Sequence, residues 1–192
     1  MKILLPLAAL SLLSSLGFSQ THEVALLPGG EQRLTVETAG GQAVLRTSMG
    51  IISGVRSVGA ADQDAQFLRW LEVAADGSST EWYAASPDGQ AWDIVRPISH
   101  ELLLRYGAHD PLEGEPAVSA RLTARPTSNL HLVQLEVPPS PSLQERLIEA
   151  GAEVHRVVPR HALLLTASPR SLRIIASLPF VRAVREYHPA FK

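Results

Sequence analysis

The last third of the chain alternates strand-like and helix-like segments, and this order restricts the possible folds more than any other feature. Alternating or continuous apolar residues indicate strands, and apolar residues three and four positions apart indicate helices. Each expected helix begins with a serine followed by proline, which suits the first helical position, and ends at a glycine or a proline. The expected order is strand 130–137, helix 141–150, strand 153–158, strand 162–166, helix 169–178 and strand 180–187.

Two strand–helix–strand units of this kind fold most simply as a four-stranded antiparallel sheet with both helices on one face. We therefore expect the α+β fold class, with a C-terminal ferredoxin-like βαββαβ domain that follows a β-rich segment. Ser140 is the expected cap of the first helix, and Ser142 with Glu145 offers an alternative capping box.

The face of this sheet opposite the helices is expected to be apolar, although an isolated domain would have a polar face there. Successive residues of a strand point to opposite faces, so each leucine-rich strand supplies apolar side chains to both. We assign Leu130, Leu132, Leu163 and Leu165 to the open face. Two explanations stay open: this face binds a partner, or the N-terminal segment covers it.

Upstream of residue 130 the expected organisation is simpler. Residues 20–106 are interpreted as a β-rich segment of unknown role, with short apolar runs separated by tight turns. Residues 62–75 also fit helical spacing, but the turn that follows favours a strand. Residues 107–129 contain scattered prolines and glycines and are expected to form an extended connector. All three tryptophans precede this connector and are expected to form the core of the β-rich segment.

Residues 1–19 have the pattern of a secretory signal peptide, with Lys2, an apolar run from Ile3 to Leu16, and small residues before Gln20. The apolar run is shorter than a membrane span, which favours cleavage after Ser19 over a retained anchor. We therefore expect a secreted or periplasmic protein, with no membrane association after cleavage.

Composition excludes several functions. The net charge is −2 without a basic block, so nucleic acid is not an expected partner. The chain has no cysteine, which excludes disulfides and thiol chemistry. Its seven histidines are scattered without metal-ligand spacing, so no metal and no cofactor are expected. His131 and His155, expected on neighbouring strands, are interpreted either as a pH sensor or as ordinary strand histidines.

The C-terminal segment resembles a known family. Its matching elements are VQLE at 133–136, LIEAGA at 147–152, LPFVR at 178–182 and YHPAFK at 187–192. With these motifs residues 130–192 look like the propeptide of secreted bacterial subtilisin-like serine peptidases. Residues 105–118 extend the resemblance weakly upstream, whereas residues 21–104 resemble no family.

The resemblance implies an intramolecular chaperone and temporary inhibitor whose partner is a subtilisin-like peptidase domain, in cis or in trans. It also implies that the open sheet face docks on the peptidase while the C-terminal tail lies in the substrate groove. The tail residues are Tyr187, His188, Pro189, Ala190, Phe191 and Lys192. In many such precursors the chain continues past this motif, so Lys192 could be a truncation point. The alternatives are a free-standing secreted inhibitor, or a structural or interaction domain without a peptidase partner.

No catalytic residue is expected in this chain. Thr47-Ser48-Met49-Gly50 resembles the serine motif of subtilisin-like peptidases, but Arg46 replaces a glycine and the motif precedes the propeptide-like segment. No Asp-Thr-Gly or His-Gly-Thr motif accompanies it, so a catalytic triad cannot be assembled. The adjacent pair His109 and Asp110 is likewise interpreted as non-catalytic. Residues 86–92 resemble the Asp-box turn of sialidase-like propellers, which predicts a hairpin with Trp92 buried behind it.

Overall fold

The structure is a computed structural model, and it describes residues 21–58, 65–105, 107–114, 116–125 and 128–191. The segment expected to be a signal peptide lies outside these residues. The described elements are β1 (His22–Leu26), β2 (Gln32–Thr38), β3 (Gly41–Ser48), β4 (Ile51–Val58), β5 (Gln66–Val73), β6 (Ser79–Ser86), β7 (Ile94–Pro97), β8 (Leu102–Leu104), β9 (Gly107–His109), β10 (Leu130–Leu135), α1 (Pro141–Glu149), β11 (Ala152–Val158), β12 (Ala162–Ala167), α2 (Pro169–Ala176), β13 (Val181–Glu186) and a 3₁₀ turn, η1 (Pro189–Phe191).

The expected fold class is wrong. The part of the chain that the structure describes is mostly β, with 49% of those residues in strands and 12% in helices, and it forms four sheets rather than a ferredoxin-like α+β fold. The physical reason is that the N-terminal β-rich segment is a folded body with two sheets of its own. The core beneath the two helices also continues to one face of the β4-β5-β6-β7 sheet, so the helices and their sheet do not form a fold that is separate from the β-rich segment.

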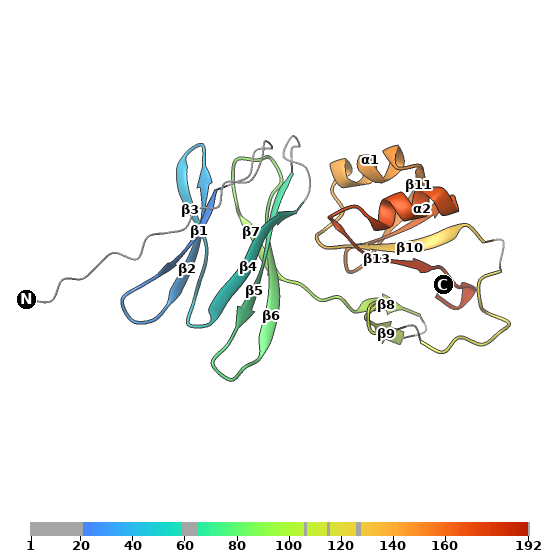
Figure 1. The fold of residues 1–192 in the computed structure, drawn as a ribbon, viewed down its shortest axis with the longest axis horizontal. Coiled ribbons are helices and arrows are strands. Elements are labelled where there is room, and N and C mark those ends of the chain that lie inside the picture. Colours follow the sequence, from blue (N-terminus) through green and yellow to red (C-terminus); the bar gives the residue numbers. More distant parts are fainter. Residues whose placement is uncertain (1–20, 59–64, 106, 115, 126–127, 192) are drawn as a thin grey trace, which may run out of the picture.

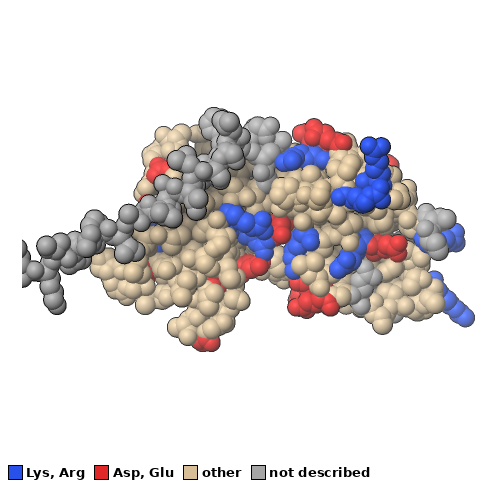
Figure 2. Space-filling model, in the orientation of Figure 1, with Lys and Arg blue, Asp and Glu red and all other residues tan. Residues whose placement is uncertain are grey.

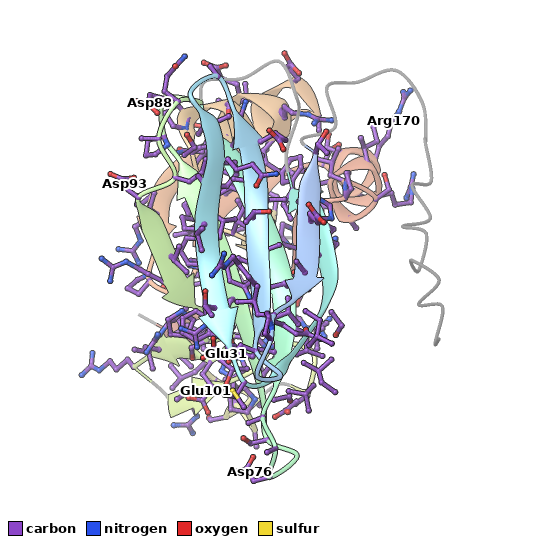
Figure 3. The ribbon with its side chains drawn as sticks, turned by 90° about the vertical axis from the view of Figure 1, so that its left-hand side faces the viewer. Glu31, Asp76, Asp88, Asp93, Glu101 and Arg170 are labelled. Carbon is purple, nitrogen blue, oxygen red and sulfur yellow. The ribbon has the colours of Figure 1, made fainter. Side chains whose placement is uncertain are left out.

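The strands β1 to β7 form a two-layer sandwich, with the sheet β1-β2-β3 facing the sheet β4-β5-β6-β7 (Figures 1 and 3). Its core contains Leu34 and Val36 from one sheet and Leu68, Trp70 and Ala84 from the other. Trp70 also stacks on Trp82, with 6.4 Å between ring centroids. The strand interpretation of residues 62–75 is confirmed over Gln66–Val73.

The β6–β7 pairing confirms the expected hairpin with Trp92 buried behind its turn. Asp88 accepts hydrogen bonds from the backbone N–H groups of Gln90 (2.9 Å) and Ala91 (3.1 Å). Trp92 is buried behind this turn in the sandwich core.

Residues 130–186 form an antiparallel sheet in the order β11-β12-β10-β13, with α1 and α2 on the same side of it (Figure 1). Both helices begin as the sequence indicates. Ser140 caps α1 by accepting from the N–H of Leu143, which decides between the two expected caps, and Ser168 caps α2. Gly151 follows α1 with a φ of +91°, the left-handed conformation that glycine adopts most easily.

One hydrophobic core joins the sandwich to this C-terminal layer. Phe67, Tyr83 and Ala85 of the sandwich belong to the same buried cluster as Leu135 and Leu147. Cross-strand pairing places Phe67 beside Ala85 and Ala85 beside Ile94, so these side chains line one face of β4-β5-β6-β7. That sheet therefore has a core on each of its faces.

Gly151 allows a direct test of the α1 terminus. A Cβ at this position would meet Ser171 Oγ at 2.5 Å, besides facing the left-handed strain of about 1–2 kcal/mol. Gly151→Ala should therefore lower the free energy of unfolding by more than Gly77→Ala, because Gly77 has a similar φ of +83° with open space around it. Urea unfolding of both variants measures the difference. Equal losses would contradict the close approach to α2.

Candidate partner-binding surface

Strand register divides the side chains of the C-terminal sheet between an inner face, toward the helices, and an outer face. Leu132 pairs with Leu164 and Val133 pairs with Leu163 across β10 and β12. Val133, Leu163 and Leu165 are buried in the core that contains the helix residues. Leu130, Leu132 and Leu164 belong to a separate cluster on the outer face.

This register corrects half of the expected open face. Leu130 and Leu132 lie on the outer face as expected, but Leu163 and Leu165 are fully buried on the inner face. The pairing of β10 with β12 is the reason, because a shift of one residue exchanges the two faces of a strand. Leu164 and Ala162 occupy the outer positions of β12 instead.

The outer face is covered by other segments of the same chain. Leu102 of β8 is completely buried in the outer-face cluster, and Leu104 and Val118 pack against it. In Figure 1 the β8–β9 hairpin lies beneath the sheet, on the side away from α1 and α2. The cover therefore comes from the end of the β-rich segment, from the connector and from the C-terminal tail.

The C-terminal tail is folded onto this face rather than extended away from it. Tyr187, Ala190 and Phe191 are buried in the outer-face cluster, and His188 is also buried. The N–H of Tyr187 donates to the carbonyl of Leu130 at 3.0 Å, which continues the β10–β13 ladder by one residue. The tail then turns at η1, where Phe191 makes edge contacts with the rings of Tyr187 and His188. Pro189 begins this turn, and Lys192 lies outside the described residues.

Two residues of β13 hold the connector against the sheet. Arg182 forms a bidentate pair with Asp110, with both N–O distances at 2.7 Å. The hydrogen bonds from Arg182 outweigh partial burial and lower the pKa of Asp110. Arg185 Nε donates to the carbonyl of Pro111 at 3.0 Å. We call residues 107–114 and 116–118 the strap, since Asp110 and Pro111 are bound to β13 and Val118 packs on the outer face.

Gln134 completes this arrangement at the edge of the outer face. Its side chain is fully buried, and its Oε1 accepts from Arg182 at 2.8 Å. Its Nε2 donates to the carbonyls of His100 (2.9 Å) and Arg160 (3.2 Å). Sequence reasoning considered Asp110 only as half of a non-catalytic pair with His109, and it gave Gln134 and Arg182 no role in this contact. The available signal was a polar residue inside an apolar strand, since a buried polar side chain requires partners.

Charged side chains also meet between the sandwich and the C-terminal layer, where Figure 2 shows blue and red atoms in contact. Arg69 of β5 pairs with Glu81 of β6 and with Glu136, which follows β10. Arg56 contacts Glu136 at 3.4 Å, and His100 pairs with Glu81. The charges of Arg69 and Glu136 therefore connect the two layers.

Burial lowers the pKa of two histidines near this junction, His100 and His161. Burial lowers the pKa of His100, although its hydrogen bond to Glu81 acts in the opposite direction. Burial, with the nearby charges of His100, Arg160 and Arg69, lowers the pKa of His161 to about 4. Burial also works to raise the pKa of Glu81, but the hydrogen bond from His100 and the charge of Arg69 outweigh it and lower that pKa.

The other residues considered from the sequence are dispersed. Ser48 ends β3 and donates to Glu72, which also accepts from Arg46 at 2.9 Å, so it belongs to a surface ion pair. His131 and His155 are not on neighbouring strands as expected, because β12 lies between β10 and β11. Among the described residues, no group of three histidines or acidic residues is arranged to hold a metal ion. Within the same residues, no helix is long and apolar enough to cross a membrane.

Comparison with protein-family models, with curated proteins and with solved structures finds no match to this chain.

The pair of Asp110 and Arg182 predicts a pH-dependent contribution to stability. Because the folded-state pKa of Asp110 is lowered, its contribution is present above the unfolded-state pKa of about 3.9 and is lost as pH falls through the folded-state value. Asp110→Asn should cost about 2 kcal/mol at pH 6 and much less near pH 2.

Urea unfolding of the wild-type protein and the variant at both pH values measures this difference. Asp93→Asn is the matched control, because Asp93 is exposed and has no ion pair among the described residues (Figure 3). A loss for Asp110→Asn that does not change with pH would contradict the ion pair.

Proposed function

We propose that residues 130–191 form a non-catalytic binding module of the propeptide type, which acts as chaperone and temporary inhibitor of a subtilisin-like peptidase. The observation that carries the proposal is the apolar outer face of the C-terminal sheet, with Leu130, Leu132 and Leu164. Once its cover has moved away, this face is an exposed apolar patch, and such patches are typical of surfaces that bind another protein. The motifs at 133–136, 147–152, 178–182 and 187–192 supply the kind of partner.

The covering of this face consists of short segments, which supports its exchange for a partner. β8 and β9 have three residues each, and the tail contributes only a 3₁₀ turn. The covering is also incomplete in its hydrogen bonding. The hydroxyl of Tyr187 and Nδ1 of His109 are buried with no hydrogen-bond partner among the described residues. A buried polar group without a hydrogen bond lowers stability by about 1–3 kcal/mol. A partner protein that forms hydrogen bonds with these groups would therefore compete with the covering segments for the outer face.

Exchange requires the tail and the strap to leave the outer face. The fraction of molecules in the open state then limits the apparent affinity, because only that fraction can bind. The bidentate ion pair of Arg182 and Asp110 opposes opening. Loosening this pair should therefore raise the association rate, whereas removing the tail should remove the part that enters a substrate groove.

Inhibition assays against a panel of subtilisin-like peptidases test the proposal. We expect the full chain at micromolar concentration to inhibit at least one of them with slow onset. Deletion of residues 187–192 should abolish inhibition while the remaining sheet still binds in calorimetry. Arg182→Gln should speed the onset by about tenfold, the effect of weakening a charge-assisted hydrogen bond by about 1.4 kcal/mol.

Arg170→Gln serves as the control, because Arg170 is an exposed arginine of α2 that is remote from the strap. Absence of both inhibition and binding across the panel would contradict the proposal. Circular dichroism of each variant separates loss of binding from loss of folding.

A second candidate is an interaction domain without a peptidase partner, and one observation favours it. Four of the tail residues, Tyr187, His188, Ala190 and Phe191, are buried within the chain itself. In that case the tail is a structural part of the core. Hydrogen exchange distinguishes the two functions. Addition of a subtilisin-like peptidase should change the exchange rates of the tail amides if the chain is a propeptide-type inhibitor, and it should leave them unchanged if the chain is an interaction domain without a peptidase partner.

A further inference from the structure

A cleft of about 370 Å³ lies between the sandwich and the start of the C-terminal layer. This volume is within the range of small-molecule sites. Phe67, Tyr83 and Ala85 line it from β5 and β6, and Ile94 lines it from β7. The opposite wall is the proline-rich connection from β10 to α1, with Pro138, Pro139 and Pro141. Its walls are therefore largely apolar and come from two different layers.

The register of the sheet determines which side chains face the cleft. Tyr83 lies directly opposite Arg96, and Ala85 lies directly opposite Ile94 across β6 and β7. The same face continues across β5, where Arg69 is opposite Tyr83 and Phe67 is opposite Ala85. One row is therefore apolar, and the next row carries arginines and a tyrosine.

Arg96 differs from the other arginines of its row because it forms no ion pair in the described part of the chain. Arg69 and Arg56 each contact Glu136, and Arg69 also contacts Glu81. Arg96 lines the cleft and has no ion pair among the described residues. Burial raises the pKa of Tyr83, and the positive charge of Arg96 opposes this rise. The guanidinium of Arg96 is therefore close enough to the phenol of Tyr83 to affect it electrostatically. The cleft thus combines apolar walls with one exposed arginine whose charge is not paired within the described residues.

We propose that this cleft binds a small amphipathic carboxylate, with its apolar body against Phe67, Ala85 and Ile94 and its carboxylate paired with Arg96. Arginine favours carboxylates because its planar fork can donate two parallel hydrogen bonds to them. A neutral ligand with the same apolar body would gain only the apolar contacts. A cationic one would meet repulsion from Arg96. The site is separate from the outer face of the C-terminal sheet, so it does not depend on the proposed function.

Calorimetric titration with 4-phenylbutyrate and with its neutral amide tests the proposal. For a ligand of about 12 heavy atoms we expect a Kd of about 0.1–1 mM for the acid. The amide should bind at least about fivefold more weakly, because it lacks the charge that pairs with Arg96. Amide resonances of Ala85 and Ile94 should shift during the acid titration, which locates the ligand in the cleft.

Arg96→Gln should reduce the affinity for the acid to that for the amide and leave the amide unchanged. Arg33→Gln is the matched control, because Arg33 is exposed and lies on β2, in the other sheet of the sandwich. Ala65→Phe should weaken both ligands by filling the cleft from its half-buried wall. If Ala65→Phe fails to fold, the affinities of Arg96→Gln for the acid and for the amide still test the proposal.

Equal binding of acid and amide to the wild-type protein, or no binding of either, would overturn the proposal. An unchanged affinity of Arg96→Gln for the acid would also overturn it. A further arm uses an acetylated tripeptide ending in phenylalanine with a free carboxylate. Tighter binding than phenylbutyrate identifies a peptide C-terminus as the source of the carboxylate, and weaker binding identifies a free acid; both support the carboxylate site.

Discussion

The sheet β4-β5-β6-β7 has a hydrophobic core on each of its faces, and the rest of the structure depends on this arrangement. Leu68, Trp70 and Ala84 face the β1-β2-β3 sheet, whereas Phe67 and Ala85 face the C-terminal layer. Neighbouring residues of one strand point to opposite faces, so the same strands supply both cores. The sandwich and the C-terminal layer cannot be described as independent bodies, because removing either would expose one of these faces.

Charges at the junction restrict how the layers meet. Arg69 has an acidic partner in each of them, Glu81 in the sandwich and Glu136 beside the C-terminal sheet. Pairs of this kind add little net stability, but a displaced layer would leave a partly buried charge without its partner. The network therefore disfavours alternative alignments. Arg96 has no ion pair in this network of described residues, and it lines the apolar cleft instead.

The outer face of the C-terminal sheet shows how one apolar surface can serve two purposes. Leu132 and Leu164 are covered by β8, the strap and the tail, so the face is not exposed to water. The cover is made of short segments held by a few polar contacts, chiefly those of Arg182 and Arg185. Stability of the isolated chain and binding of a partner then compete for the same residues. A cover of this type would make binding depend on local opening rather than on global unfolding.

Local signals in the sequence determined the secondary structure of the C-terminal layer well. Serine caps and prolines at the first helical position set the start of both helices, and Gly151 follows the end of α1, because these signals act within one turn of chain. The alternation along residues 130–137 correctly placed Leu132 on the outer face. The turn at Asp88 and the strand at 66–73 also follow from local chemistry.

Tertiary structure alone decided the fold class, the covering of the sheet and the site residues. Leu163 and Leu165 were assigned to the wrong face because strand register depends on a partner strand about thirty residues away. Burial of the tail depends on contacts with Leu122 and Ala124, far from it in the sequence. Asp110 and Arg182 are separated by 72 positions, and the cleft at Arg96 requires prolines from another layer. The spacing of apolar residues along a sequence predicts which residues are buried, but it does not predict which other segments pack against them.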